Sequence, residues 1–172
     1  MSFSVNEFKS TAMSGGGARP SLFEVQINGP MPDTRFHVRA TTIPQSTLGT
    51  VIVPYFGRQV KLAGNRTFDD WTVTVLNDEN FEIRNALESW SNSINQHSPN
   101  LQVLGPGKAN YEGTAEVIQY GKNGDELQRY KFIGIYPVAI STIDLAWEAE
   151  AIEEYTVTWA YDWWEHTSAG VI

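Results

Sequence analysis

Apolar and polar residues alternate along several short stretches of this chain, and a period of two is typical of a half-buried β-strand. The clearest example covers residues 69–76, where Trp71, Val73 and Val75 alternate with polar or smaller residues. This stretch therefore predicts a strand with one face in the core and the other toward solvent.

The same alternation occurs near the N-terminus, at residues 22–27 and again at residues 35–40. Between the two runs lies a turn rich in glycine and proline, at residues 29–33. Alternating runs joined by a short turn are typical of a hairpin, so we expect these two strands to pair with each other.

The C-terminal half also predicts β-structure. Residues 114–120 and 127–134 flank an Asn-Gly turn, which favours a tight hairpin. Residues 138–147 and 152–164 are expected to form a last long pair of strands. Four of the six tryptophans follow residue 146, and such a cluster indicates either core packing or an interface.

One stretch has the period of an α-helix instead. Four apolar residues share one helical face there: Ile83, Leu87, Trp90 and Ile94. Asp78 is a suitable N-cap and Ser98-Pro99 ends the pattern, so we expect a helix over about residues 79–97. Together these elements predict a mainly β fold, an antiparallel β-barrel or sandwich with one flanking α-helix.

The chain shows no internal repeat and is expected to form a single domain over residues 20–165. Residues 1–19 are expected to form a flexible or partner-ordered arm, because consecutive glycines separate a short helical segment from the first strand. Residues 45–65 predict a protruding hairpin or loop, since Pro and Gly flank their β-branched residues. Residues 166–172 are expected to form a C-terminal tail.

Composition limits the chemistry. A chain of 172 residues can bury roughly 70% of its unfolded surface, and it has no cysteine for disulfides, thiolate metal sites or thiol catalysis. No apolar run approaches the roughly 20 residues of a membrane-spanning helix. The N-terminal residues also lack the basic and apolar segments of a secretory signal. We therefore expect synthesis in the cytoplasm and no stable membrane association.

Charge is distributed unevenly along the chain. The net charge of −8 disfavours a protein that wraps nucleic acid, which needs a basic footprint. Residues 34–68 contain five basic residues and no acidic one, whereas residues 132–172 contain seven acidic residues and no Lys or Arg. Either these segments neutralise each other within one domain, or they meet between copies in a heterologous contact that builds rings or filaments.

The sequence contains no recognisable catalytic or cofactor-binding constellation. His37, His97 and His166 are far apart and have no metal-ligand spacing. Asp69 and Asp70 are adjacent in a predicted strand, so their carboxylates point to opposite faces and do not form an acid–base pair. No Walker loop or Gly-x-Ser-x-Gly motif is present. We therefore expect no enzymatic activity, no cofactor and no metal.

Residues 63–78, with the sequence AGNRTFDDWTVTVLND, closely resemble the tail tube proteins of contractile-tailed bacteriophages. The motif residues are Gly64, Arg66, Thr67, Phe68, Asp69, Asp70 and Trp71. Shorter pieces agree in order, from Ala18-Arg19-Pro20 to Asp162-Trp163-Trp164-Glu165, so the resemblance covers about residues 18–165. The chain departs from the family at Asn65 and Ala146, where the family often has Asp.

The resemblance implies a structural protein of the virion, made in the host cytoplasm. In this family β-barrel or β-sandwich subunits with one flanking helix form hexameric rings, and the rings stack into a tube. A sheath protein surrounds the tube, baseplate and tail-terminator proteins close its ends, and DNA passes through the lumen without specific binding. Type VI secretion and pyocin tubes share this architecture.

The residues suggest how such a tube would be held together. Edge strands of neighbouring subunits are expected to pair, which closes the ring. Within the protruding segment, Arg58, Lys61 and Arg66 are the candidates for contacts between stacked rings. An acidic lumen would repel DNA phosphates, although the sequence does not say which acidic residues line it.

Two other functions stay open from the sequence. One is a tube subunit of a genome-free contractile injection device of the pyocin or type VI kind. The other is a monomeric carbohydrate-binding β-sandwich, whose exposed aromatic residues would stack on sugars. The second function leaves the 63–78 motif and the charge segregation unexplained.

Overall fold

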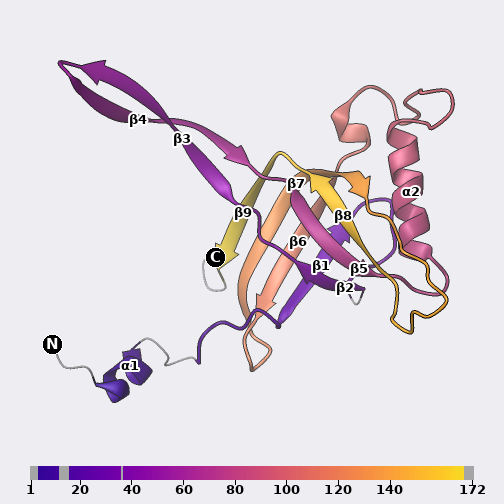
Figure 1. Cartoon of the computed structure of the whole chain (residues 1–172), viewed down its shortest axis with the longest axis horizontal. Helices are drawn as coiled ribbons and strands as arrows, with labels where there is room; N and C mark the ends of the chain where they lie inside the picture. Colours follow the sequence, from indigo (N-terminus) through magenta and orange to yellow (C-terminus); the bar gives the residue numbers. More distant parts are fainter. Residues whose placement is uncertain (1–3, 12–15, 36, 169–172) are drawn as a thin grey trace.

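The computed structural model describes residues 4–11, 16–35 and 37–168, and its elements are mainly antiparallel strands, as the sequence predicts. In chain order they are α1 (Val5–Thr11), β1 (Phe23–Asn28), β2 (Val38–Thr41), β3 (Ser46–Tyr55), β4 (Arg58–Phe68), β5 (Trp71–Leu76), α2 (Glu82–Ile94), the 3-10 turn η1 (Lys108–Asn110), β6 (Gly113–Tyr120), β7 (Glu126–Ile140), β8 (Glu154–Ala160) and β9 (Trp163–Ser168). Only α2 flanks the sheets, whereas α1 stands apart from them and buries no residue (Figure 1).

Seven of the strands form one hydrogen-bonded system that is folded into two layers at β7. The strand order is β1-β6-β7-β8-β5-β2, and β9 pairs with the other side of β7. The first part of β7 pairs with β6 and β9, while residues 136–140 pair with β8. The layers face each other, because Trp71 of β5 stacks on Phe132 of β7 with ring centroids 4.4 Å apart. The result is an antiparallel β-sandwich.

The expected hairpin between residues 22–27 and 35–40 is wrong. β1 pairs with β6 and β2 pairs with β5, so the two segments belong to different layers. The chain after the turn is held to β1 by a side chain: the buried Thr34 hydroxyl accepts from the Ile27 N–H at 3.2 Å and donates to the Val25 carbonyl at 3.3 Å. Alternation predicts a strand and its buried face, but it does not identify the neighbouring strand.

The last predicted pair of strands, residues 138–147 and 152–164, also differs from the observed strands. β7 ends at Ile140 and residues 141–153 form a loop, so the predicted strand 138–147 is wrong beyond residue 140. The predicted strand 152–164 is two strands, because the chain leaves one layer after Ala160 and enters the other as β9. β9 continues to Ser168, which places residues 166–168 in the sheet rather than in a tail.

The change of layer coincides with Gly134 in β7. This glycine has φ 69°, and a Cβ there would lie 2.5 Å from the Asp162 carboxylate. Asp162 is itself paired with Lys108. A residue without a side chain is therefore required where the two layers of the sandwich diverge.

The core is built from the predicted apolar faces. Its largest buried side chains are Trp71, Trp90, Trp159, Tyr155, Phe132 and Leu87. The helical stripe is confirmed, since Ile83, Leu87 and Trp90 are buried and Ile94 packs against them. The C-terminal tryptophans differ in burial: Trp159 is buried in the core, whereas Trp147 is fully exposed.

The helix is shorter than expected, running from Glu82 to Ile94 instead of 79–97. Its N-cap residue is Phe81, in the left-handed conformation, and not Asp78. The Asp78 carboxylate nevertheless accepts from the Glu82 N–H at 3.2 Å, so it satisfies one of the unpaired donors at the helix start.

Trp90 fixes the helix against the strands. Its indole N–H donates to the Tyr111 carbonyl at 2.8 Å, and its ring lies over two glycines. A Cβ on Gly29 would lie 2.7 Å from this ring, and a Cβ on Gly113 would lie 3.1 Å from the ring and 2.5 Å from the Asn28 carbonyl.

Candidate assembly surfaces

β3 and β4 form a two-stranded antiparallel sheet of their own, and it extends away from the sandwich (Figure 1). Every residue from 51 to 60 is exposed. The exposed side chains include many large apolar ones: Leu48, Val51, Ile52, Val53, Tyr55, Phe56, Val60 and Leu62. A hairpin this apolar has no core of its own within the described chain.

The register of the hairpin assigns its side chains to two faces. Val51 lies opposite Leu62 and Val53 opposite Val60, so these four residues share one face. Ile52 lies opposite Lys61 on the other face. Both faces therefore carry apolar residues.

The tip of the hairpin is a two-residue turn. Phe56 and Gly57 both have positive φ, 44° and 75°, as in the type I′ turns that favour tight hairpins. The Phe56 side chain is 89% exposed and packs edge-on against Tyr55, with ring centroids 4.6 Å apart. Arg58 lies opposite Tyr55. The tip therefore presents two aromatic rings beside a cation.

The three predicted stacking residues occupy different places on this hairpin. Arg58 lies at the tip, Lys61 lies on the opposite face, and Arg66 lies near the base. The Arg66 guanidinium donates to the Ser46 hydroxyl at 2.7 Å. Arg58 and Lys61 form no ion pair with any residue that the structure describes.

The family motif connects this hairpin to the core. Gly64 allows the close approach of the two strands at a bulge, since a Cβ there would lie 3.1 Å from the Gly49 backbone. Thr67 pairs with Thr47, and the Phe68 ring packs near Trp164.

The remaining motif residues follow into β5. The Asp69 carbonyl accepts from the Tyr161 hydroxyl at 2.6 Å, and the Asp70 side chain is exposed. Trp71 is fully buried, and its indole N–H donates to the Thr41 hydroxyl at 2.9 Å. The motif thus anchors the hairpin to the sandwich.

A second exposed surface lies on the loop of residues 141–153. Leu145 is 81% exposed, Trp147 is fully exposed and Ile152 is 72% exposed. Their acidic neighbours Asp144, Glu148 and Glu150 are exposed as well. We call residues 144–152 the acidic loop. The sequence alone shows that these acidic residues and Trp147 are neighbours. Its apolar–polar alternation does not distinguish this exposed tryptophan from the buried ones.

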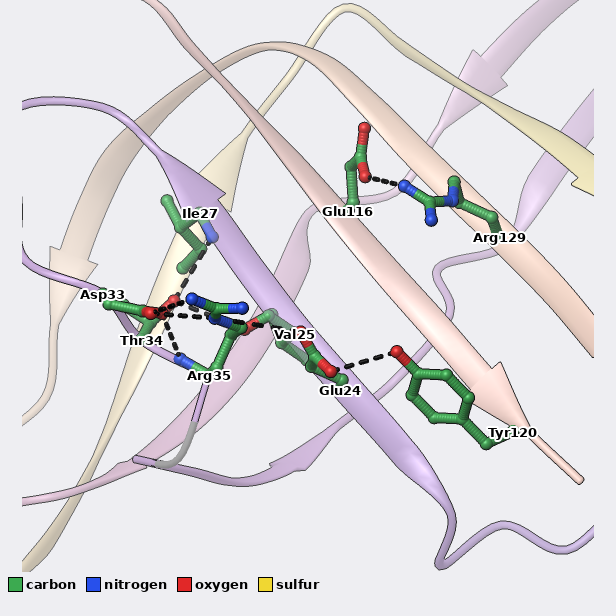
Figure 2. Close-up of polar contacts among 9 residues, drawn as sticks. All are labelled: Glu24, Val25, Ile27, Asp33, Thr34, Arg35, Glu116, Tyr120 and Arg129. Atoms are coloured by element: carbon green, nitrogen blue, oxygen red, sulfur yellow. Dashed lines mark hydrogen bonds and ion pairs between the residues drawn. The ribbon is translucent and has the colours of Figure 1, made fainter. Parts of the chain in front are cut away.

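A third surface is the polar face of β1, β6 and β7 (Figure 2). The Arg129 guanidinium contacts Glu126 at 2.8 Å and Glu116 at 2.5 Å. Glu24 accepts from the Tyr120 hydroxyl at 3.0 Å. The Arg129 charge on this face is therefore already neutralised by carboxylates of the same subunit.

These contacts also shift the pKa values of some of the groups involved. The hydrogen bond from Arg129 lowers the pKa of Glu126, and the hydrogen bonds from Arg35 lower the pKa of Asp33. Burial, followed by the hydrogen bond to Glu24, raises the pKa of Tyr120. Each shift keeps the group in its resting protonation state near neutral pH, which is unlike an acid–base catalyst.

No metal site is assembled in the part of the chain that the structure describes. His37 precedes β2, His97 follows α2 and His166 lies in β9, and no three acidic or histidine side chains gather as ligands there. Among the described helices, none is long and apolar enough to cross a membrane.

Comparisons with known proteins point to one family. A family model described as phage tail tube protein matches residues 5–167. Tail tube protein gp19 of Enterobacteria phage T4 is 34% identical over 154 residues, which cover 88% of this chain and 93% of that protein. The tail tube protein of Serratia phage KSP90 is 26% identical over 161 residues, covering 88% and 89%.

Solved structures of low sequence identity share the fold. A chain of the PVC sheath–tube complex, an extracellular contractile injection system in the extended state, has a TM-score of 0.66 at 13% identity, with 98% of this chain and 100% of that chain covered. Hcp1 from Salmonella typhimurium has a TM-score of 0.51 at 12% identity, with 86% of each chain covered.

Proposed function

Because this chain belongs to the phage tail tube protein family, we propose that its hexameric rings stack into a hollow tube. Family membership makes it a structural component of a phage tail. The observation that carries the assembly proposal is the β3–β4 hairpin, which is apolar on both faces and exposed in a single subunit. Exposed apolar patches of this kind mark interaction sites.

Ring formation uses the open strand edges. β1, β2 and β9 each have one edge without a neighbouring strand among the described residues. Such edges pair readily with other chains. Pairing between subunits would continue the sheets around the ring and leave no lateral edge open. In this organisation residues 20–168 form the tube domain, because β9 continues to Ser168, and the segment before residue 20 is an arm that stacking orders.

Ring stacking uses the cations of the hairpin. Arg58 and Lys61 are exposed and lie on opposite faces, so the hairpin offers a cation on each side. Arg66 contributes at the base, where Ser46 holds its guanidinium. Their expected partners are acidic residues of the adjacent ring, and such pairs fix register more than they add affinity.

Around the tube we propose a contractile sheath, with baseplate and terminator proteins at the ends. A chain of similar fold belongs to a PVC sheath–tube complex, and others belong to an anti-feeding prophage baseplate and tube-terminating cap. DNA would pass through the lumen without specific binding, because a net charge of −8 per subunit repels phosphates.

A genome-free injection device is the alternative within this class. The relatives of 34–35% identity are tail tube proteins of phages T4 and T6, whereas the injection-system chains share the fold at 11–14% identity. The sequence relatives therefore favour a phage. We propose no enzymatic activity, since the chain belongs to a family of tail tube proteins and no cluster of metal ligands is assembled among the described residues.

Electron microscopy of the concentrated protein tests the assembly. End-on views averaged without imposed symmetry are expected to give sixfold rings or tubes. A different rotational symmetry would overturn the hexamer. Protein that stays dispersed even when mixed with its sheath and baseplate partners would overturn the tube itself.

A further inference from the structure

We propose that the hairpin tip of one subunit docks on the acidic loop of another copy of this chain. The tip comprises residues 55–58 together with Lys61, and the acidic loop comprises residues 144–152. This inference rests on the proposed tube assembly. It adds the surface that receives the hairpin, which the assembly proposal leaves unassigned.

The charges of the two surfaces are complementary. The paired strands of residues 46–68 carry Arg58, Lys61 and Arg66 and no acidic residue. The acidic loop carries Asp144, Glu148 and Glu150 and no basic residue. The side chains of Arg58 and Lys61 on one surface and of the three acidic residues on the other are exposed. Opposite unpaired charges on two surfaces of one chain favour their contact between copies.

The two carboxylates that follow the acidic loop already contact other residues of the same subunit, unlike the three carboxylates within it. Glu153 accepts from the Asn77 amide at 2.8 Å, and Glu154 pairs with Arg39. Asp144, Glu148 and Glu150 form no ion pair with a residue that the structure describes. These three are therefore the carboxylates available to a partner's cations.

The apolar residues of the two surfaces also match. The tip presents the rings of Tyr55 and Phe56, and the acidic loop presents the side chains of Leu145 and Trp147. Trp, Tyr and Arg dominate the energy of protein interfaces when they are buried at the centre and ringed by polar groups. Contact between these surfaces would cover the most exposed tryptophan and the most exposed phenylalanine among the residues that the structure describes.

The positions of the two surfaces exclude contact within one subunit. Figure 1 shows the hairpin tip at one end of the long axis of the molecule, while the loop between β7 and β8 lies beyond the sandwich toward the other end. Two complementary surfaces on opposite ends of one chain make a heterologous contact, which propagates from copy to copy. A sheath protein or the N-terminal arm is another conceivable occupant of the acidic loop, and the test below separates them.

Cross-linking is well suited to this test because the chain contains no cysteine. Gln59→Cys and Ala149→Cys place one thiol next to the tip and one in the acidic loop, without removing Phe56, Arg58 or Trp147. Both positions are exposed. When the assembled variant that carries both cysteines is treated with a short bis-maleimide, it is expected to give a ladder of covalent multimers. Each single variant is expected to give no ladder.

The matched control combines Gln59→Cys with Asn123→Cys, an exposed position in the turn between β6 and β7. It is expected to give no ladder. Tubes visible by microscopy without a Gln59–Ala149 ladder would overturn the docking surface and leave the tube assembly intact. Absence of any tube from the unmodified protein, with its partners added, would overturn the assembly and this inference together.

A charge exchange gives an independent readout. Arg58→Glu with Lys61→Glu is expected to raise the protein concentration needed for tube formation roughly tenfold or more. Adding Glu148→Lys and Glu150→Lys to the same chain is expected to restore most of the loss. Unchanged assembly of the first variant, or no restoration in the second, would show that the hairpin docks elsewhere, on the sheath or on the arm.

Discussion

The β3–β4 hairpin and the β5–β8 strand pair are both antiparallel and both rich in β-branched residues, yet only one of them is buried. In β5 the residues alternate between buried and half-buried, and each pairs with a residue of β8. In the hairpin, Val51, Ile52 and Val53 follow one another and all three are exposed. Consecutive apolar residues place apolar groups on both faces of a strand.

This difference indicates which residues or molecules bury the apolar surface of each region. The strand pair buries one face in its own subunit and needs no other molecule. Residues 51–60 of the hairpin are exposed among the described residues, so in the proposed tube both faces depend on neighbouring copies. Stability of the subunit and assembly of the tube should therefore respond to different substitutions.

The largest effect on the subunit is expected from Trp90→Ala. The side chain is 2% exposed and its ring lies against Trp159, with centroids 5.6 Å apart. Its loss should leave a cavity under α2 and cost about 3–5 kcal/mol of unfolding free energy. Thermal unfolding measures the change. A melting temperature equal to that of the unmodified protein would mean that the helical stripe is not part of the core.

Gly113→Ala should cost about 1–3 kcal/mol, because the added methyl group meets the Asn28 carbonyl and the Trp90 ring. Gly121→Ala is the matched control, since its Cβ would have its nearest neighbour at 3.5 Å, an ordinary contact. Denaturant unfolding of both variants checks the difference. Equal stability of the two would show that the strands and the helix relax easily around Trp90.

The same substitution in the two regions tests the comparison directly. Val73→Thr buries a hydroxyl in the core of the strand pair and should cost about 1–3 kcal/mol. Val53→Thr changes an exposed residue, so the subunit should lose less than about 0.5 kcal/mol. Tube formation, followed by sedimentation, should instead weaken in the Val53→Thr variant. Normal tubes from that variant would show that this face of the hairpin is not buried against a neighbouring subunit in the tube.

The smallest effect is expected from pH. Arg129 lowers the pKa of Glu126 below its ordinary value of 4.5, so the folded state favours the ionised carboxylate. Its contribution is complete above the ordinary pKa and is lost as the pH falls through the lowered pKa. The melting temperature should therefore drop slightly more on acidification in the unmodified protein than in Glu126→Gln. Identical pH profiles would mean that the pair contributes nothing measurable.

The parts of the fold that the sequence predicted well are those with local signals. The alternation in β5 and the apolar stripe of α2 depend on residues a few positions apart, and both are confirmed. The partner of β1 was missed because it is β6, whose pairing residues lie about 90 positions later, from Asn28 with Thr114 to Phe23 with Gln119. No local pattern specifies such a pairing. The break between β8 and β9 was missed because the strand alternation continues across it.

The sequence predicted the candidate surfaces only in part, as it did the fold. The sequence singled out Arg58 and Lys61 through the charge asymmetry, but only the strand register places them on opposite faces. Trp147 was one of several tryptophans in an acidic region, and its full exposure follows from the end of β7 at Ile140. Exposure depends on where strands end, and strand ends are set by tertiary packing.

The continuity of β7 through both layers has a mechanical consequence. Layers of a β-sandwich that touch only through side chains can slide when those contacts repack. Here one strand of 15 residues runs from the first layer into the second, so sliding would have to stretch its covalent backbone near Gly134. A load on one layer is therefore transmitted to the other along the main chain. Under compression the subunit should behave as a stiff unit, and the contacts between subunits should yield first.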